Sequence, residues 1–396
     1  MNVNVSPQRQ RIISIDVLRG LVMVIMALDH TRDYFHETAF TDNPLNLATT
    51  TGPLFFTRWI THFCAPTFVF LAGTSAYLMG LKKTRAEMSS FLIKRGIWLI
   101  LVELFIITLF ITFNPFYNVF ILQVIWAIGI SMVLLGVAVR LPFKVILIIG
   151  LLIFLGHNLI DYPEAKRNGQ LGFWWTLIHG AFGTFQIWPH HVLAIFYSFL
   201  SWTGIMFLGY CFGKCFDPGL NAAQRKRILV GLGWALILVF IALRFINLYG
   251  DPVPWSVQRN GFYTFLSFIN TNKYPPSLMY ACMTLGPSIL FLSFIGKYNN
   301  RFTSFCKVYG RVPFFYYVVH FFLIHFLNVI FFFISGFGIK DIVNPNLPMF
   351  FLPPHYGYGL WVVYGVWIFV VLLLYLPCRW YNKIKSSRKY WWMSYL

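Results

Sequence analysis

Imidazole and carboxylate side chains gather at the end of the first apolar segment of the chain. Asp29 precedes His30, and Asp33 is three residues from both His30 and His36. Residues three or four apart are neighbours on a helix, so each histidine lies within reach of a carboxylate. A carboxylate can fix the tautomer of an imidazole and stabilise its cation, as general-base catalysis requires. In the alternative, this end of the helix is an interfacial ion-pair cluster formed by Asp29, Arg32, Asp33 and Glu37.

A buried arginine lies earlier in the same segment. Arg19 is eleven residues before His30, which is about 20° beyond three full helical turns and about 16 Å along the helix axis. The two side chains therefore share one face, and Asp16, one turn before Arg19, can neutralise it. Charged residues within a membrane span are costly and face a cavity or a partner. The spacing thus predicts a polar stripe that lines an internal passage.

The composition shows what must position this stripe. Of 396 residues, 58% are hydrophobic and 11% are charged, whereas soluble domains carry roughly 25% charged residues. A bilayer span needs about 20 apolar residues, and such stretches recur along the chain. We predict an all-α, polytopic membrane helix bundle of about ten spans, formed by residues 1–396 as a single domain. The predicted spans are 14–36, 54–80, 91–113, 117–139, 142–160, 190–213, 226–249, 274–296, 309–335 and 358–380.

Basic residues alternate between the two sides of these spans. Lys and Arg cluster before the first span, in every second loop and after the last span, including Arg9, Arg11, Arg388 and Lys389. This pattern predicts that both termini are cytoplasmic. The net charge of +19 then reflects orientation in the membrane, because the charges form short clusters between apolar spans. We expect no binding of nucleic acid.

Other polar residues fall inside or beside the spans. His62 has Thr and Cys neighbours on one polar face, which fits either a ligand-facing or a core histidine. Lys273 and Ser277 open the eighth span at the outer face, where Lys273 can bind an anionic acceptor or anchor at the headgroups and Ser277 can cap the helix. Glu103 and Arg244 lie deeper, and either pair with each other or line a donor tunnel.

The remaining histidines suggest packing more than metal binding. His320 and His325 are five residues apart, so they diverge by about 140° around their helix and cannot both line one narrow site. At least one of them is expected to make a packing or interhelical contact. His179, His190 and His191 have no obvious carboxylate pair at ligand spacing, so we predict no metal.

Several segments are recognisable as family motifs. Residues 15–20 are Ile-Asp-Val-Leu-Arg-Gly, and residues 29–35 are Asp-His-Thr-Arg-Asp-Tyr-Phe. These segments resemble the bacterial branch of the heparan-alpha-glucosaminide N-acetyltransferase catalytic-domain family. Segments 61–75, 201–210, 272–278 and 310–325 resemble its later motifs in the same order, although Ser201 stands where a proline is usual.

This resemblance implies transmembrane acetylation. In the family, an acetyl group from cytoplasmic acetyl-CoA passes to a sugar amine across the membrane. Related acyltransferase-3 enzymes carry an arginine eleven residues before a catalytic histidine, as Arg19 and His30 are spaced. The lysosomal family member has Asn and Tyr where Asp29 and His30 stand and uses a later histidine, for which His36 is the nearest match. Both histidines therefore remain candidates.

We accordingly expect an acyl-CoA-dependent O- or N-acetyltransferase of the cell inner membrane. The expected catalytic residues are His30, His36, Asp33 and Asp29, with Arg19 and Arg244 binding acetyl-CoA. The expected acceptor-binding residues are Arg32, His62, Lys273 and Ser277. Expected partners are the lipid bilayer, acyl-CoA and an extracytoplasmic glycan or sugar, and a homodimer is an open alternative. A secondary transporter or exporter of a small sugar or lipid is the competing interpretation, which the absence of visible internal repeats disfavours.

Overall fold

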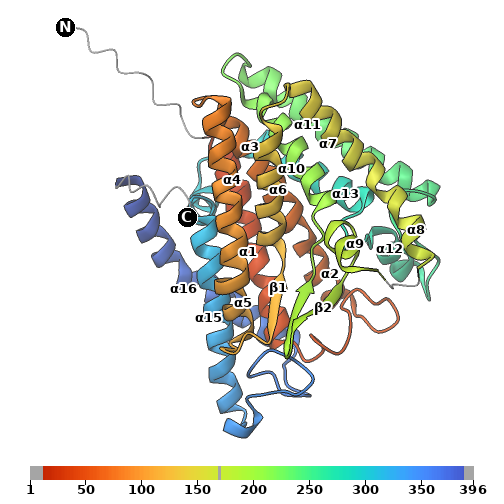
Figure 1. Cartoon of the computed structure of the whole chain (residues 1–396), viewed down its shortest axis with the longest axis vertical. Helices are drawn as coiled ribbons and strands as arrows, with labels where there is room; N and C mark the ends of the chain where they lie inside the picture. The colour runs from red at the N-terminus through yellow and green to blue at the C-terminus, as the bar shows by residue number, and fades with distance from the viewer. Residues whose placement is uncertain (1–11, 168–170, 388–396) are drawn as a thin grey trace.

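The computed structural model describes residues 12–167 and 171–387. Long helices run roughly side by side along the long axis of the molecule (Figure 1). The helices are α1 (Ile13–Phe35), α2 (Gly52–Ile60), α3 (Cys64–Gly80), α4 (Arg85–Val102), α5 (Thr108–Thr112), α6 (Val124–Ala138), α7 (Phe143–Gly156), α8 (Asp161–Ala165), α9 (Phe173–Ile178), α10 (Leu200–Phe212), α11 (Ala222–Ile246), α12 (Gly261–Ile269), α13 (Leu278–Ile295), α14 (Arg301–Gly310), α15 (Pro313–Ile334) and α16 (Leu360–Ser387).

Seven helical segments of the described chain are long and apolar enough to cross a membrane. They are Gly52–Gly80, Arg85–Thr112, Phe143–Ala165, Ala222–Ile246, Leu278–Ile295, Pro313–Ile334 and Leu360–Ser387. Three further predicted spans fall outside this group for physical reasons. The segment α1 carries several charged residues, whereas α6 and α10 have only 15 and 13 residues. The structure thus supports a multi-pass helical membrane protein, and the count of ten and the orientation stay predictions. Arg9, Arg11, Arg388 and Lys389 lie outside the described residues.

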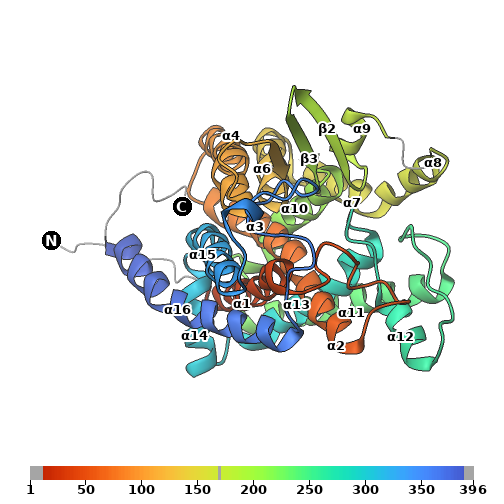
Figure 2. The same cartoon turned by 90° about the horizontal axis from the view of Figure 1, so that it is seen from below.

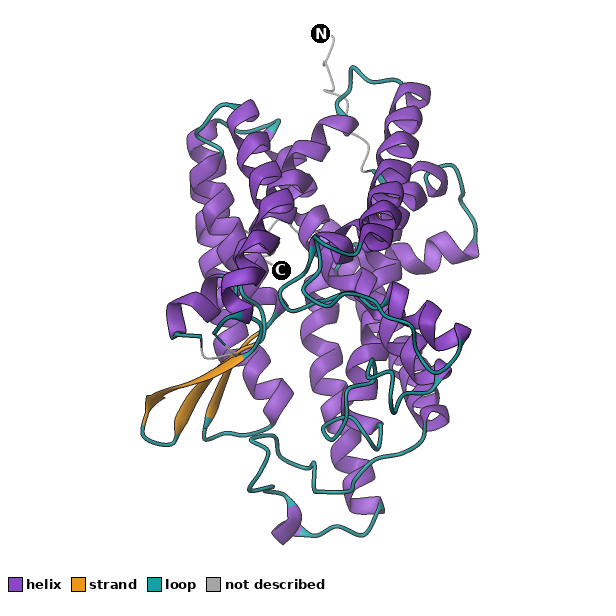
Figure 3. Ribbon diagram, turned by 90° about the vertical axis from the view of Figure 1, so that its right-hand side faces the viewer, coloured by secondary structure: helices purple, strands orange, loops and turns teal. Residues whose placement is uncertain are grey.

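The all-α prediction is wrong in one region, where the chain forms a small sheet. The strands are β1 (Val119–Leu122), β2 (Gly183–Trp188) and β3 (His191–Ile195), with β3 in the middle, parallel to β1 and antiparallel to β2. Two predicted spans, 117–139 and 190–213, therefore begin as strands, and their helices start only after Gln123 and Phe199. Figure 3 shows the sheet at one end of the bundle. Short runs rich in Val, Ile, Phe and Leu suit strands as well as helices, and here they satisfy each other's backbone groups.

Proline explains two other helix boundaries. The predicted span 309–335 is split, because Pro313 has no N–H to donate and begins α15, leaving α14 as a separate helix. The predicted tight turn between the fourth and fifth spans is confirmed: α6 ends at Ala138 and α7 begins at Phe143, directly after Pro142.

The helix α1 lies at the centre of the bundle. It packs against α3, α13, α14, α15 and α16, and Figure 2 shows these helices around it. Its crossing with α14 is very close: a Cβ on Gly20 would lie 1.8 Å from the Cys306 carbonyl oxygen, and a Cβ on Gly310 would lie 1.8 Å from the Asp16 carbonyl oxygen. Only glycine permits this approach, as at small-residue interfaces of membrane helices.

The crossing gives a direct prediction. Gly310→Ala forces α1 and α14 apart and is expected to lower the free energy of unfolding by about 1–3 kcal/mol. Gly365→Ala in α16 is the matched control, because no atom lies within 4 Å of its added Cβ. Thermal unfolding of the purified variants in one detergent compares them, and equal melting temperatures for both variants would contradict the close crossing.

Candidate active site

A cavity of about 250 Å³ lies beside α1. Its walls come from α1, α3, α4, α6 and α15, and its largely apolar lining includes Met23, Met26, Met79 and Met132. Four basic side chains also line it: Arg19, Arg95, Arg311 and Lys385. Arg95, Arg311 and Lys385 belong to basic clusters that the charge pattern predicts to be cytoplasmic, so the basic end of the cavity is expected to face the cytoplasm.

The predicted polar face of α1 runs along this cavity. Arg19, Met23 and Met26 line it, and His30 is the next residue on the same helical face. Tyr317, which also lines the cavity, presents its ring edge-on to His30 with 6.4 Å between ring centroids. The cavity therefore extends from Arg19 toward the imidazole of His30, as the spacing of the two residues predicts.

Arg19 is held by a small polar network at the basic end. Its guanidinium donates a hydrogen bond to the Ser75 hydroxyl at 2.8 Å and lies 3.8 Å from the Asp16 carboxylate. Arg311 approaches the same carboxylate at 3.7 Å. The predicted pairing of Asp16 with Arg19 is thus confirmed, and one carboxylate is shared between two guanidinium groups. The network leaves a net positive charge at this end of the cavity.

His30 is oriented by another histidine. Its Nδ1 lies 2.7 Å from Nε2 of His320, and its ring stacks on Phe321 with 4.1 Å between centroids. Asp33, the carboxylate expected to orient a catalytic imidazole, instead accepts a hydrogen bond from Arg32 and has a side chain that is 40% exposed. The correction has a physical reason: the neighbouring Arg32 binds the Asp33 carboxylate, whereas His320 of α15 contacts the His30 ring directly.

His36 is placed apart from the cavity. It follows the last residue of α1, and its Nδ1 accepts a hydrogen bond from the backbone N–H of Thr38 at 3.2 Å. The backbone of His36 forms an isolated bridge with Tyr358. In the described chain it contributes nothing to the cavity lining. Neither histidine is itself a lining residue, but His30 contacts Tyr317 of the cavity wall, whereas His36 contacts Thr38 and the backbone of Tyr358.

A buried ion cluster lies next to His30 along α1. Asp29 pairs with Arg32 at 3.2 Å and with Arg58 of α2 at shorter range. Arg58 also donates to the Tyr274 hydroxyl at 3.4 Å, and the Lys273 ammonium group lies 5.1 Å from the centre of the Tyr274 ring. The expected ion-pair cluster around Asp29 and Arg32 thus exists, but it is a junction of distant segments. Sequence reasoning missed Arg58, whose only signal is that it is one of few outer-side cations.

His62 borders this cluster and is fully buried. Among the described residues neither of its ring nitrogens has a hydrogen-bond partner, although Tyr280 presents its ring to it and donates to its backbone carbonyl at 2.9 Å. Its charged neighbours are Arg58, Lys273 and Asp29. Two unpartnered nitrogens beside cations favour the ligand-facing alternative, since a core histidine is normally satisfied.

Arg244 and Ser277 both make hydrogen bonds to the segment that precedes α13. The Arg244 guanidinium donates to the carbonyls of Ser267, Phe268 and Asn270 at 2.7–2.8 Å, and it lies 3.9 Å from Asp251. The Ser277 hydroxyl donates to Asp251 at 2.7 Å and caps α13. Burial raises the pKa of the Asp251 carboxyl, and the hydrogen bonds from Ser277 and Asn272 oppose that shift. These contacts correct the expected ligand roles, because both side chains are occupied in fastening the loop before α13.

Glu103 and His325 also make contacts within the protein. Of the two alternatives for Glu103 and Arg244, mutual pairing is not formed: Glu103 begins a π-helical turn, and one of its oxygens accepts a hydrogen bond from the backbone N–H of Gln123. His325 contacts the carbonyls of Phe110 and Phe350 at 3.2 and 3.1 Å. The predicted divergence of His320 and His325 is therefore confirmed: one faces His30 and the other holds an outer loop.

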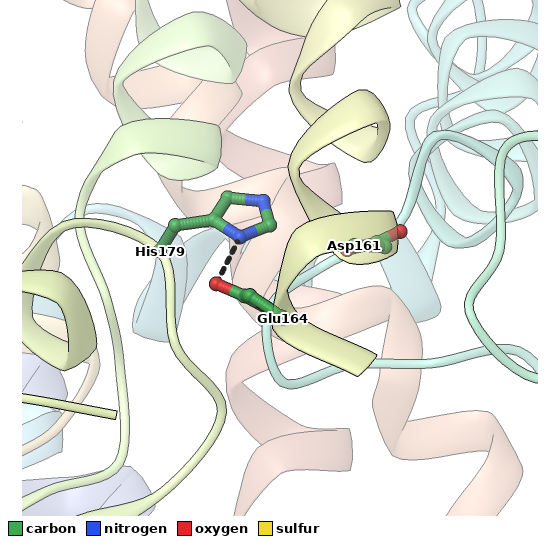
Figure 4. A group of neighbouring side chains, drawn as sticks. All are labelled: Asp161, Glu164 and His179. Atoms are coloured by element: carbon green, nitrogen blue, oxygen red, sulfur yellow. Dashed lines mark hydrogen bonds and ion pairs between the residues drawn. The ribbon is translucent and has the colours of Figure 1, made fainter. Parts of the chain in front are cut away.

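One group of described residues could offer ligand atoms to a metal. Donor atoms of Asp161, Glu164 and His179 all lie within 4.8 Å of one another (Figure 4). Asp161 and Glu164 are three residues apart on α8, a carboxylate pair that the sequence-based expectation did not include, and Asp161 accepts a hydrogen bond from Asn158 at 2.7 Å. Glu164 already accepts from His179 at 2.9 Å and from Trp175 at 2.6 Å, and the other nitrogen of His179 lies 3.2 Å from His157. Protein hydrogen bonds account for this group, and the expected absence of a metal stays a prediction.

The ion cluster gives a second prediction. Asp29→Asn leaves the Arg58 guanidinium without its buried counter-charge, and we expect a loss of about 3–5 kcal/mol in stability. Asp33→Asn is the control, because that carboxylate is 40% exposed and its pair contributes about 0–1 kcal/mol. Denaturant or thermal unfolding in detergent measures the loss of stability in each variant. Similar losses for the two variants would contradict a larger contribution of Asp29 than of Asp33.

Comparison with known proteins identifies the family. The family model described as heparan-alpha-glucosaminide N-acetyltransferase, catalytic, matches residues 11–249. The match spans α1 to α11 and includes Arg19, His30 and Arg58. Among curated proteins, the comparison found no match. The matched region covers more than half of the 396 residues, so the chain belongs to the family of the heparan-alpha-glucosaminide N-acetyltransferase catalytic domain, which consists of transmembrane acetyltransferases.

Proposed function

We propose that the protein transfers an acetyl group from cytoplasmic acetyl-CoA to a hydroxyl or amine of an extracytoplasmic sugar or glycan. The observation that carries this proposal is a cavity with basic residues at one end and His30 beyond the other. Family membership supports acetyl transfer, and the predicted orientation supports a donor that enters from the cytoplasm. The protein would act in the cell inner membrane with both termini in the cytoplasm.

Acetyl-CoA is expected to bind with its phosphates at the basic end. Arg19, Arg95, Arg311 and Lys385 supply charge-assisted hydrogen bonds to phosphate oxygens. A cavity of about 250 Å³ is smaller than the roughly 300–1,000 Å³ of sites that enclose a drug-sized ligand. The nucleotide therefore stays at the opening, and the pantetheine arm enters among the methionines. The distance of about 16 Å from Arg19 to His30 along α1 suits an extended arm.

His30 is the group placed to do the chemistry. As the acceptor oxygen or nitrogen attacks the thioester carbonyl, Nε2 of His30 takes the proton from that O–H or N–H. The C–S bond then breaks, and the imidazolium of His30 gives this proton to the departing thiolate, which leaves as free CoA. Apolar walls keep bulk water away from the thioester. His36 remains a candidate by family resemblance, but the contact of His30 with Tyr317 in the cavity wall favours His30.

The acceptor would approach from the other side of His30. Asp29, Arg32, Arg58 and Lys273 form a buried cluster there, with the unpartnered ring of His62 at its edge. Lys273, Arg58 and His62 can donate hydrogen bonds to the hydroxyls or charged groups of a sugar. Ser277 and Arg244 would then contribute indirectly, by fixing the loop that carries Lys273.

The donor part of the proposal is tested by Arg19→Gln. Loss of one charge-assisted hydrogen bond of about 1.5–3 kcal/mol should raise the KM for acetyl-CoA about 10- to 100-fold with a small effect on kcat. The measurement is release of free CoA from acetyl-CoA by purified protein with a mixed pool of aminosugars and glycans. Lys340→Gln, in the loop after α15, is a control for the loss of any surface cation. An unchanged KM in Arg19→Gln would overturn the assigned donor site.

The catalytic part is tested by comparing the two histidines. His30→Ala should lower kcat about 10²- to 10⁴-fold, as expected for a general base, whereas His36→Ala should retain most activity. Labelled acetyl-CoA with vesicle-reconstituted protein reports transfer to an acceptor enclosed on the other side. Wild-type activity in His30→Ala would reject acetyl transfer by this site. Movement of sugars across the vesicle membrane without acetyl-CoA would reject it as well, and would favour a transporter.

A further inference from the structure

We propose that His320 is a positioning residue that fixes His30 in the one tautomer able to act as a base toward the acceptor. The inference rests on the proposed function of His30. It assigns to α15 a role that lies outside the matched region 11–249. The observation behind it is a chain of two hydrogen bonds that begins at a backbone carbonyl and ends at the imidazole of His30.

The first link determines which nitrogen of His320 carries hydrogen. Nδ1 of His320 lies 3.0 Å from the carbonyl oxygen of Tyr316, one turn earlier on α15. A carbonyl oxygen can only accept, so Nδ1 of His320 must be the donor. In a neutral ring, Nε2 of His320 then has an unprotonated lone pair.

The second link transfers this constraint to His30. Nε2 of His320 lies 2.7 Å from Nδ1 of His30. Because Nε2 of His320 is the acceptor, Nδ1 of His30 carries the hydrogen, and its own Nε2 is left unprotonated. The opposite arrangement requires a cationic His320. That cation would be fully buried with no carboxylate bonded to its ring among the described residues, which makes it costly in a membrane interior.

Packing holds the two rings in this geometry. Tyr316 is nearly parallel to His320, with an angle of 4° between the ring planes, and Phe321 stacks on His30. His320 is fully buried, whereas His30 is partly exposed. Only His30 can therefore meet a substrate, and His320 acts through it. The charged groups around His30 are Asp29, Arg58 and Lys273, and Asp29 is already paired with Arg58 and Arg32.

The arrangement defines what happens to the proton. When Nε2 of His30 takes a proton from the acceptor, the ring becomes an imidazolium whose Nδ1–H donates to His320. The positive charge is thus stabilised by a neutral acceptor, Nε2 of His320. Many hydrolases use a carboxylate for this purpose instead. After the C–S bond breaks, the same proton passes from Nε2 to the thiolate, and both rings return to their starting tautomers. No other reactant is needed.

Two amide substitutions separate the two hydrogen bonds of His320. In His320→Gln the terminal amide oxygen can occupy the place of Nε2 and accept from His30. In His320→Asn the shorter amide can reach only the place of Nδ1, so the contact with Tyr316 survives and the contact with His30 is lost. His325→Gln is the matched control, because His325 lies on the same helix, its ring nitrogens bond only to backbone carbonyls, and its ring stacks on Phe113 rather than on His30.

We expect His320→Asn to lower kcat about tenfold to 100-fold, with the KM for acetyl-CoA nearly unchanged. Loss of the acceptor for Nδ1–H makes the imidazolium harder to form, so the acid limb of the kcat–pH profile should move to lower pH by about one unit. His320→Gln should keep kcat within about tenfold of wild type and restore the profile. His325→Gln should lower thermal stability and leave the profile unchanged.

The outcomes distinguish this inference from the proposed function. If His30→Ala is inactive while folded His320→Asn keeps the wild-type kcat and pH profile, the inference is overturned and the proposed function stands. Equal losses in folded His320→Gln and His320→Asn would also overturn it, since a role of bulk or packing alone predicts no difference. If His30→Ala is as active as wild type, the proposed function itself fails.

Discussion

The cost of placing charges inside a membrane protein governs the structure around α1. This helix carries Asp16, Arg19, Asp29 and Arg32, and each lies in the interior with a partner supplied by another element or by its own helix. Asp16 is shared with Arg311, Arg19 bonds to Ser75, and Asp29 holds Arg58. Because an unpaired charge in this environment is so unfavourable, these contacts also determine where the neighbouring segments must lie. The charged side chains of α1 that flank the candidate site thus also hold the surrounding loops and helices in place.

The polar groups of α1 divide into two sets, and His30 lies where they meet. Toward the start of the helix, cations gather around a largely apolar cavity that suits a long, flexible, phosphorylated donor. Beyond His30, one carboxylate of α1 and cations from α1, α2 and the segment before α13 form a compact network with one unsatisfied histidine at its edge. A single histidine can therefore contact reactants that arrive from opposite sides. The proposed reaction exchanges only one small group at this meeting point, so it requires no large opening through the whole bundle.

Local patterns in the sequence predicted the parts of this arrangement that depend on helical spacing. The common face of Arg19 and His30, the pairing of Asp16 with Arg19 and the divergence of His320 from His325 follow from 3.6 residues per turn. What failed depends on contacts between distant residues. The partner of His30 is 290 residues away, so the nearest carboxylate, Asp33, was the natural but incorrect choice. Similarly, the runs at Val119–Leu122 and His191–Ile195 have the composition of buried helix, and only their mutual pairing makes them strands. Arg58 gave no local signal at all, since its role arises from the approach of α2 to Asp29.

The backbone contact at Gly20 and Gly310 has a consequence for how the molecule can move. At this crossing the main chains of α1 and α14 are in contact, with no side chains between them that could adjust. Translation or rotation of α1 against α14 would therefore produce steric overlap. Carriers that expose a site alternately to each side rely on such relative motion between helix groups. Here α1, which carries His30, is held in place against α14. In the proposed reaction, the acetyl group forms its bond to the acceptor at a stationary imidazole and its C–S bond to CoA then breaks, so the protein framework itself can stay still.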